Sequence, residues 1–165
     1  MLSWPYIVSD LLRQLNIFCK VWSQGPPGKP LRRAGLIFTL RYTYAKDVKE
    51  LALFLNSRLS LGLDLGKVIF IRSQGSRSRA LARTLGLPSQ WRFILGDSRL
   101  YIVEVISEKY DRLSCEEKVY VILHELMHIP TSMSGGLRHH GYRGFGSLRR
   151  LMRMLDEKEI EAYCK

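Results

Sequence analysis

The sequence has few cysteines and no apolar run long enough to cross a lipid bilayer. A transmembrane helix needs about 20 consecutive apolar residues, so we expect no membrane-spanning segment. The three cysteines, Cys19, Cys115 and Cys164, are scattered and form no C-x-x-C pair. Because an odd, unpatterned set argues against a disulfide framework, we expect free thiols and a reducing, cytoplasmic setting.

Acidic residues are missing from three long stretches of the chain, residues 11–45, 65–96 and 135–155. These stretches keep their arginines and lysines, and the formal net charge of the whole chain is +11. A surface with an excess of positive charge attracts polyanions. Nucleic acid is therefore a candidate partner through a basic surface, although such a surface also serves solubility alone.

The clearest break in the chain is the segment Q-G-P-P-G-K-P at residues 24–30, which is typical of a linker. The apolar residues ahead of it are spaced as in a short amphipathic helix: Val8, Leu11, Leu12 and Leu15. We therefore expect an N-terminal helix and Pro/Gly linker over residues 1–30, and a folded domain over residues 31–165.

The remaining patterns predict an α+β fold. Runs of β-branched and aromatic residues predict strands at 36–44, 67–72 and 100–106. Apolar spacing and cap residues predict helices at residues 47–60 (with Asp47 as N-cap), 77–85 and 148–163. We expect the strand at 100–106 to offer a sheet edge with which an extended substrate can pair.

One further helix has limits that are visible in the sequence. Ser114 and Glu117 form a capping box at its start, and Pro130 ends it. Between these limits, apolar residues recur at helical spacing and predict one buried face: Val119, Ile122, Leu123, Leu126 and Met127.

This helix carries the motif H-E-x-x-H. His124 and His128 are four residues apart, so their imidazoles project from one face and can bind one metal ion. Glu125 lies beside them and can act as general base on a metal-bound water. The pattern indicates a zinc site with hydrolytic chemistry.

A catalytic zinc ion needs three protein ligands and one open position for water. All four histidines lie between residues 124 and 140, so His139 and His140 are the nearby candidates for the third ligand. They follow Gly135 and Gly136 in a loop whose glycines allow the backbone to fold back under the helix.

Other ligand sets fit less well. The metzincin spacing requires Gly at position 131 and His at 134, where this chain has Thr131 and Ser134. A glutamate from the last predicted helix is the competing third ligand, with Glu157, Glu159 and Glu161 available. We favour a histidine, because two adjacent histidines on a Gly-rich loop have few other uses. A closed structural zinc site is disfavoured since such sites are usually rich in cysteine.

Longer motifs surround this site. H-E-L-x-H-I-P occupies residues 124–130, and S-G-x-L-R-x-H-G occupies residues 134–141. Upstream lie R-S-Q-G-S-R-S-R-A from Arg72, Y-I-V-E-V-I-S-E-K-Y from Tyr101 and L-S-C-E-E-K from Leu113. Over about residues 47–152 the chain resembles a family of zinc metallopeptidases of archaea and phages, which are zincin-like and distantly SprT-like.

The resemblance implies a minimal zincin-like fold in which a small sheet packs against the H-E-x-x-H helix. It implies that His124 and His128 are metal ligands and that Glu125 is the catalytic residue. His140 matches the third ligand because it directly precedes Gly141. His139 stands where the family pattern has no ligand, and it stays the alternative.

We therefore predict a Zn²⁺-dependent metallopeptidase that hydrolyses a peptide or protein substrate with zinc-activated water and Glu125 as general base. The alternative is a nucleic-acid-associated metal-binding protein whose zinc is structural or whose peptidase activity is vestigial.

Overall fold

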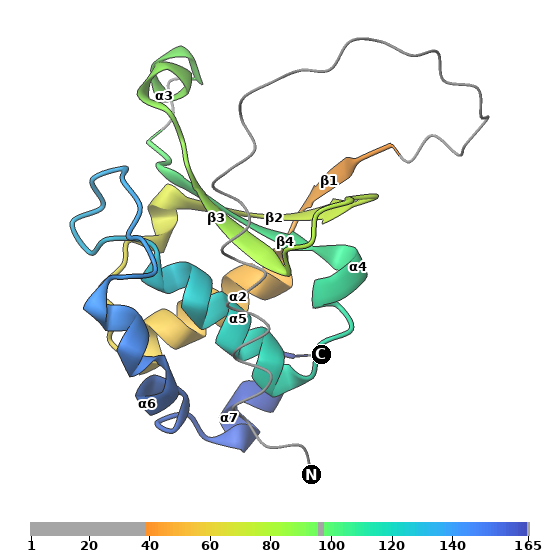
Figure 1. Cartoon of the computed structure of the whole chain (residues 1–165), viewed down its shortest axis with the longest axis vertical. Coiled ribbons are helices and arrows are strands. Elements are labelled where there is room, and N and C mark those ends of the chain that lie inside the picture. Colours follow the sequence, from red (N-terminus) through yellow and green to blue (C-terminus); the bar gives the residue numbers. More distant parts are fainter. Residues whose placement is uncertain (1–38, 96–97, 165) are drawn as a thin grey trace.

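The computed structural model describes residues 39–95 and 98–164. They form an α+β domain, which confirms the predicted fold class, with a small sheet and helices on one of its faces (Figure 1). The strands are β1 (Arg41–Tyr44), β2 (Val68–Gln74), β3 (Ala82–Gly86) and β4 (Tyr101–Ile106). The predicted N-terminal helix and the boundary at residue 30 lie outside the described residues and stay predictions.

The four strands are ordered β1-β2-β4-β3 across the sheet. β2 and β4 run parallel, whereas β1 and β3 are antiparallel to their neighbours. The predicted strand at 100–106 is confirmed as β4. The expectation that it offers a free edge is wrong, because β4 is paired on both sides and β3 forms the edge.

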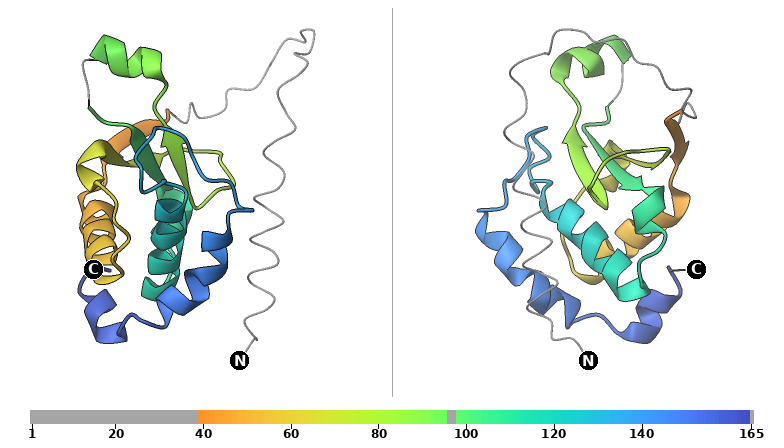
Figure 2. Two further views of the ribbon diagram at one scale, coloured as in Figure 1. Left: turned by 90° about the vertical axis from the view of Figure 1, so that its left-hand side faces the viewer. Right: turned by 45° about the vertical axis from the view of Figure 1, so that its right-hand side comes forward.

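Two long helices, α2 (Lys46–Arg58) and α5 (Cys115–Met127), pack against the same face of the sheet (Figures 1 and 2). Alternate β4 residues, Tyr101, Val103 and Val105, point into this layer and are fully buried. The shorter helices are α3 (Ser89–Leu95), α4 (Ser107–Tyr110), α6 (Leu148–Met152) and α7 (Glu157–Glu161), with 3₁₀ turns η1 (Leu65–Lys67) and η2 (Arg143–Ser147).

The helix α5 begins and ends as the sequence predicts. The Ser114 hydroxyl accepts from the backbone N–H of Glu117, and the Glu117 carboxylate accepts from the N–H of Ser114, so the capping box is complete. His128 is the C-cap, two residues before Pro130. The apolar face predicted for this helix is buried, except that Met127 is only partly covered.

The predicted helix at residues 77–85 is wrong. Residues 77–81 contain no helix, and the next five residues form the edge strand β3. Alanine, leucine and arginine are good helix formers, and they make this segment look helical from its sequence. Antiparallel pairing with β4 overrides that preference, because it satisfies the backbone of residues 83 and 85 from outside the segment.

Two other helix limits also differ from the prediction. The last helix is broken into α6 and α7, because Asp156 caps a new helix by accepting from the N–H of Lys158. Asp47 is not an N-cap: α2 begins one residue earlier, and Asp47 forms an ion pair with Arg72 instead.

The expectation of free thiols is wrong for two of the three cysteines. Cys115, at the start of α5, forms a disulfide with Cys164, and their Cα atoms are 5.4 Å apart. Their sequence separation is 49 positions. No spacing rule links two cysteines that far apart, so the pairing depends on how α7 packs against α5.

Among the described residues, no helix combines the length and the apolar character that crossing a bilayer requires.

Candidate metal centre

The C-terminal half of α5 presents two of the predicted ligands on its accessible side. Ile122, Leu123 and Leu126 are fully buried against the sheet and α2, which fixes how the helix is rotated about its axis. His124 and His128 therefore lie on the other side, one turn apart, with ring centroids separated by 5.1 Å.

The loop after α5 turns back toward these histidines. Gly135 adopts a φ of +88°, which favours glycine. Tyr101 anchors the turn, since its hydroxyl accepts from the N–H of Gly135 (2.7 Å) and donates to the carbonyl of Gly136 (3.1 Å). A backbone hydrogen bond from Arg138 N–H to the His128 carbonyl (2.7 Å) then ties the loop to the end of the helix.

This loop brings His140 to the pair on α5. One ring nitrogen from each of His124, His128 and His140 lies within 4.8 Å of the others, and the group could hold a metal ion. The Nε2 atoms of His124 and His140 are 3.1 Å apart. The centroid of His140 is 5.2 Å from that of His124 and 4.7 Å from that of His128, so the three rings surround one point.

The competing candidates lie elsewhere. His139 is exposed, and its Nδ1 accepts a hydrogen bond from the backbone N–H of Gly141 (3.0 Å), within its own loop. The three glutamates of the last segment belong to α7, where Glu159 pairs with Arg58 at 3.0 Å. The described structure groups none of these residues with His124 and His128.

The orientation of His128 is set by a backbone carbonyl. Its Nδ1 lies 2.7 Å from the carbonyl oxygen of Arg138. A carbonyl can only accept, so Nδ1 carries the proton and donates it, which leaves the lone pair of Nε2 free. A hydrogen bond from the second ring nitrogen to a backbone carbonyl fixes the tautomer and ring orientation of metal-binding histidines.

The three imidazoles are biased toward their neutral form. Burial lowers the pKa of His124 to about 3, and the neighbouring rings of His128 and His140 add to the effect. Burial also lowers the pKa of His128 and of His140. A neutral imidazole keeps a lone pair on one nitrogen, which is the form that binds a metal ion.

Phe145 packs against all three histidine rings. Its ring centroid lies 5.0 Å from that of His124, 4.8 Å from His128 and 5.4 Å from His140. It is positioned by η2, where Gly144 lies so close to Met127 that a Cβ there would come within 3.0 Å of its methyl carbon. Sequence reasoning missed Phe145, because nothing local distinguishes it from an ordinary core phenylalanine.

The side chain of Glu125 extends from α5 toward the edge strand β3. It is 6% exposed, and its Oε2 is 2.8 Å from the hydroxyl oxygen of Thr84 in β3. Burial raises the pKa of Glu125 to about 7, against the opposing effect of hydrogen bonds from Thr84. The sequence does not point to Thr84, because the composition of residues 77–85 favours a helix rather than a strand.

Tyr142 and Arg138, which flank the loop, interact with each other. The guanidinium carbon of Arg138 lies 4.4 Å from the centroid of the Tyr142 ring. This cation–π contact holds the two side chains against each other within the loop.

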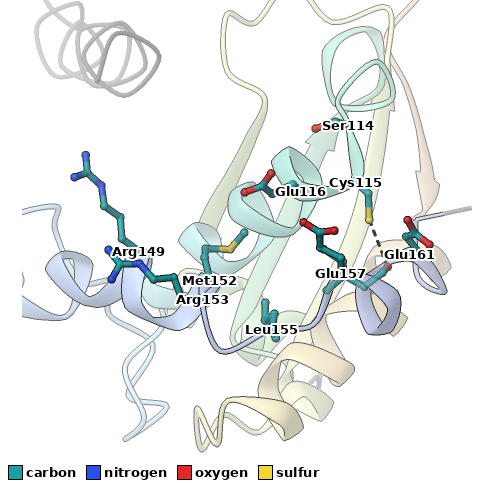
Figure 3. Close-up of a pocket in the computed structure, with 10 residues that line it drawn as sticks. Ser114, Cys115, Glu116, Arg149, Met152, Arg153, Leu155, Glu157 and Glu161 are labelled. Atoms are coloured by element: carbon teal, nitrogen blue, oxygen red, sulfur yellow. Dashed lines mark hydrogen bonds between the residues drawn. The ribbon is translucent and has the colours of Figure 1, made fainter. Parts of the chain in front are cut away.

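A pocket of about 720 Å³ lies at the opposite end of α5 from the histidines (Figure 3). Ser114 and Glu116 of α5 line it together with Arg149, Arg153 and Glu157 of the C-terminal segment. Figure 3 shows these side chains together with Met152 and Leu155, which also line the pocket. The metal-binding group and this pocket are therefore separate features.

A comparison with known protein families agrees with a metal-binding site. The family described as putative phage metallopeptidase matches residues 40–164. The chain belongs to this family. Its match includes every residue of the site and extends beyond the 47–152 span over which the resemblance was recognised from motifs. No curated protein and no solved structure matches the chain.

Proposed function

We propose that the protein is a zinc-dependent metallopeptidase. The observation that supports this most directly is the convergence of three imidazole nitrogens within 4.8 Å, two from α5 and one from the loop after it, beside the buried Glu125 of α5. A phage metallopeptidase family supports peptide bonds as the substrate.

The donor set fits zinc. Three neutral imidazoles are a known ligand set for catalytic zinc, and they leave a fourth position open. His124, His128 and His140 would hold the ion, with His128 oriented by the carbonyl of Arg138. A zinc ion held in this way supplies a Lewis acid and lowers the pKa of a water molecule to near 7.

Glu125 would handle the protons. It accepts a proton from the attacking water and later donates it to the leaving amine of the cleaved peptide. Burial raises the pKa of Glu125 to about 7, which suits both halves of this role near neutral pH. Phe145 packs against the three rings and gives them an apolar neighbour.

The substrate would be an extended peptide that pairs with β3. Leu81 and Leu87 hydrogen-bond to β4 at the two ends of this strand, so in an antiparallel ladder the alternate residues Ala82, Thr84 and Gly86 direct their backbone groups away from β4. An extended chain can pair with such an edge. This assigns to β3 the role that the sequence had suggested for residues 100–106.

Metal binding is tested with matched histidine variants. Wild-type protein produced with ample zinc should contain one zinc ion per chain by elemental analysis. His140→Ala should lose tight binding, whereas the neighbouring His139→Ala should keep it. Zinc-free wild-type protein, or equal losses in the two variants, would contradict the proposed ligand set.

Hydrolysis is tested with Glu125→Gln. This variant should retain zinc and lose cleavage of a mixed peptide library by about 10²- to 10⁴-fold, the usual contribution of a positioned general base. Glu50→Gln, at an exposed position on α2, is the matched control and should cleave at the wild-type rate. Full activity of Glu125→Gln would exclude Glu125 as the base.

A second candidate function, contact with nucleic acid, is favoured by the arginines of residues 138–153. None of them forms an ion pair with a described residue, and four are exposed: Arg143, Arg149, Arg150 and Arg153. Arg138 is the fifth, and the segment begins beside His140 and follows η2 into α6. Such a surface would hold a polyanion beside the metal centre.

This second function is tested by the salt dependence of oligonucleotide binding. Fluorescence anisotropy should show affinity that falls steeply as salt rises, since bound counterions are released. Replacing Arg149, Arg150 and Arg153 with Gln should weaken binding more than the same change at the exposed Lys46, Lys49 and Arg112. Equal effects of the two triple variants would exclude this surface.

A further inference from the structure

The hydroxyl group of Thr84 lies against the residue that would act as base. Its Oγ1 is 2.8 Å from the carboxylate Oε2 of Glu125 and 2.9 Å from the backbone carbonyl oxygen of the same residue. Thr84 is the only described residue that hydrogen-bonds this carboxyl group. A residue of the edge strand is thus bonded both to the helix backbone and to the functional side chain.

We propose that Thr84 is a positioning residue, whose hydroxyl holds the carboxyl group of Glu125 in the orientation from which it serves the metal centre. The proposal rests on the proposed function of Glu125 as general base. It assigns to β3 a second task besides pairing with substrate, which is to fix the side chain that moves the protons.

The burial of Glu125 makes such a partner necessary. Its side chain is 6% exposed, and a buried carboxyl group without a hydrogen-bond partner is costly. The carboxyl group could otherwise rotate about the flexible Glu side chain. The contact with Thr84 removes that freedom, because threonine itself is stiff at χ1.

The hydroxyl group can serve Glu125 both before and after proton transfer. It has one proton and can donate it to one of the two nearby oxygens at a time. When the carboxylate is ionised, the hydroxyl donates to Oε2. When the carboxyl group carries the proton, the hydroxyl accepts from it and donates to the backbone carbonyl of Glu125. The oxygen of Thr84 need not move between these arrangements.

The position of Thr84 is fixed by its own strand. Leu87 N–H donates to the carbonyl of Leu100 (2.8 Å), and Ile106 N–H donates to the carbonyl of Leu81 (2.9 Å), at the two ends of the β3–β4 ladder. Next to Thr84 and on the opposite face of the sheet, Arg83 pairs at 2.7 Å with Glu104, which is 2% exposed. The strand is therefore held on its outer face while Thr84 reaches toward α5.

Crystal structures of two variants test the contact independently of turnover. Thr84→Val removes the hydroxyl but keeps the β-branched shape, whereas Thr84→Ser keeps the hydroxyl. We expect the Glu125 carboxyl group to leave its position in Thr84→Val and to keep it in Thr84→Ser. An unchanged carboxyl position in Thr84→Val would overturn the proposal, whether or not the protein cleaves peptides.

Steady-state kinetics give the second readout. Loss of a hydrogen bond that orients a functional side chain costs about 10- to 100-fold in activity, so kcat of Thr84→Val should fall by that factor. KM and zinc content should stay near the wild-type values, and Thr84→Ser should restore kcat to within a few-fold. Thr43→Val, an exposed threonine of β1, is the matched control and should have wild-type kcat.

The outcomes separate this proposal from the function on which it rests. A fully active Glu125→Gln would refute the role of the base itself. An inactive Glu125→Gln together with a fully active Thr84→Val would overturn the role of Thr84 alone. Equal losses of kcat in Thr84→Val and Thr84→Ser would also overturn it, because they would point to packing rather than to the hydroxyl.

Discussion

The two ends of α5 are held in place by different kinds of contact. At its N-terminal end, a capping box and the Cys115–Cys164 disulfide secure the helix, and a pocket without histidines lies beside them. At its C-terminal end, no covalent link is present among the described residues, and the helix is joined to its loop by hydrogen bonds and ring contacts. The first end serves stability, and the second is arranged so that a metal ion would complete it.

Because their contacts differ in kind, the N-terminal end of α5 cannot exchange a ligand and the C-terminal end adds little stability of its own. A disulfide limits the unfolded chain and tolerates no exchange of partners on the time scale of catalysis. Imidazoles that surround an open point can gain and lose a ligand, but they add little stability without one. Changes at the N-terminal end should therefore alter unfolding, and changes at the C-terminal end should alter metal binding.

The largest effect on stability is expected from breaking the disulfide. Cys164→Ser should lower the free energy of unfolding by about 2–4 kcal/mol, since the bond closes a long loop in the unfolded chain. Urea titration measures this change, and zinc content should stay at the wild-type level. Cys19→Ser is the matched control. Equal stability of Cys164→Ser and wild type would show that the bond does not form in solution.

The next largest effect is expected at η2, beside the histidines. Gly144→Ala would place a Cβ 3.0 Å from the methyl carbon of Met127 and 2.8 Å from Cδ1 of Tyr142. Overpacking of this kind costs roughly 1–3 kcal/mol, and we expect it to displace Phe145 from the three rings. Zinc affinity, measured by competition with a chelator, should fall about 10-fold.

Gly146→Ala is the control for this change, because no heavy atom lies within 4 Å of a Cβ at that position. It lies in the same turn and should leave zinc affinity unchanged. If the two glycine variants bind zinc equally well, the packing of η2 does not support the metal centre.

A smaller effect is expected from the capping box. Ser114→Ala removes the acceptor for the N–H of Glu117 and should lower the free energy of unfolding by about 1 kcal/mol. Thermal unfolding measures the change, with Ser132→Ala in an exposed loop as control. Zinc affinity should not change; a loss of zinc comparable to that of Gly144→Ala would remove the distinction between the two ends.

The smallest effect is expected at α4, just before α5. The pKa of Glu108 is lowered from its usual value of 4.5 by its own backbone N–H and by that of Gly75. A lowered folded-state pKa contributes stability above the unfolded-state pKa, and this stability is lost as pH falls through the folded-state value. Glu108→Gln should therefore be slightly less stable than wild type at pH 7, and the difference should vanish in acid.

Thermal unfolding across this pH range would check the sign. A difference that grows as pH falls would contradict the hydrogen bonds to Glu108. Glu50→Gln on α2 serves as the comparison, because no hydrogen bond to its side chain is found among the described residues.

The parts of the fold that depend on neighbouring residues could be predicted from the sequence. The capping box of Ser114 and Glu117 and the turn between His124 and His128 follow from spacing within one helix. β4 is recognisable because five of its six residues are β-branched or aromatic, with Glu104 the exception, and this gives a strong local signal. The α+β class follows from such elements, whereas the family resemblance depends on the longer motifs at residues 124–130 and 134–141.

The parts that depend on distant residues could not be predicted. The segment 82–86 becomes a strand only because β4 pairs with it. The contact between Thr84 and Glu125 depends on that strand, so it could not be predicted either. The Cys115–Cys164 bond likewise depends on the placement of α7. The structure groups His140 rather than His139 with the helix, but the role of each residue in metal binding stays a prediction.

The strand order has a consequence for the time at which the site forms. β3 precedes β4 in the chain, yet β4 is the strand to which it is hydrogen-bonded, so β3 has no partner until residues 101–106 have been synthesised. The contact of Thr84 requires α5, which follows β4 in the chain. The group of His124 and His128 is completed only by His140 in the next loop, and the disulfide of Cys115 only by Cys164 near the C-terminal end. An incomplete chain therefore lacks the histidine group, the Thr84–Glu125 contact and the disulfide together, and it gains all three only when the C-terminal segment is present.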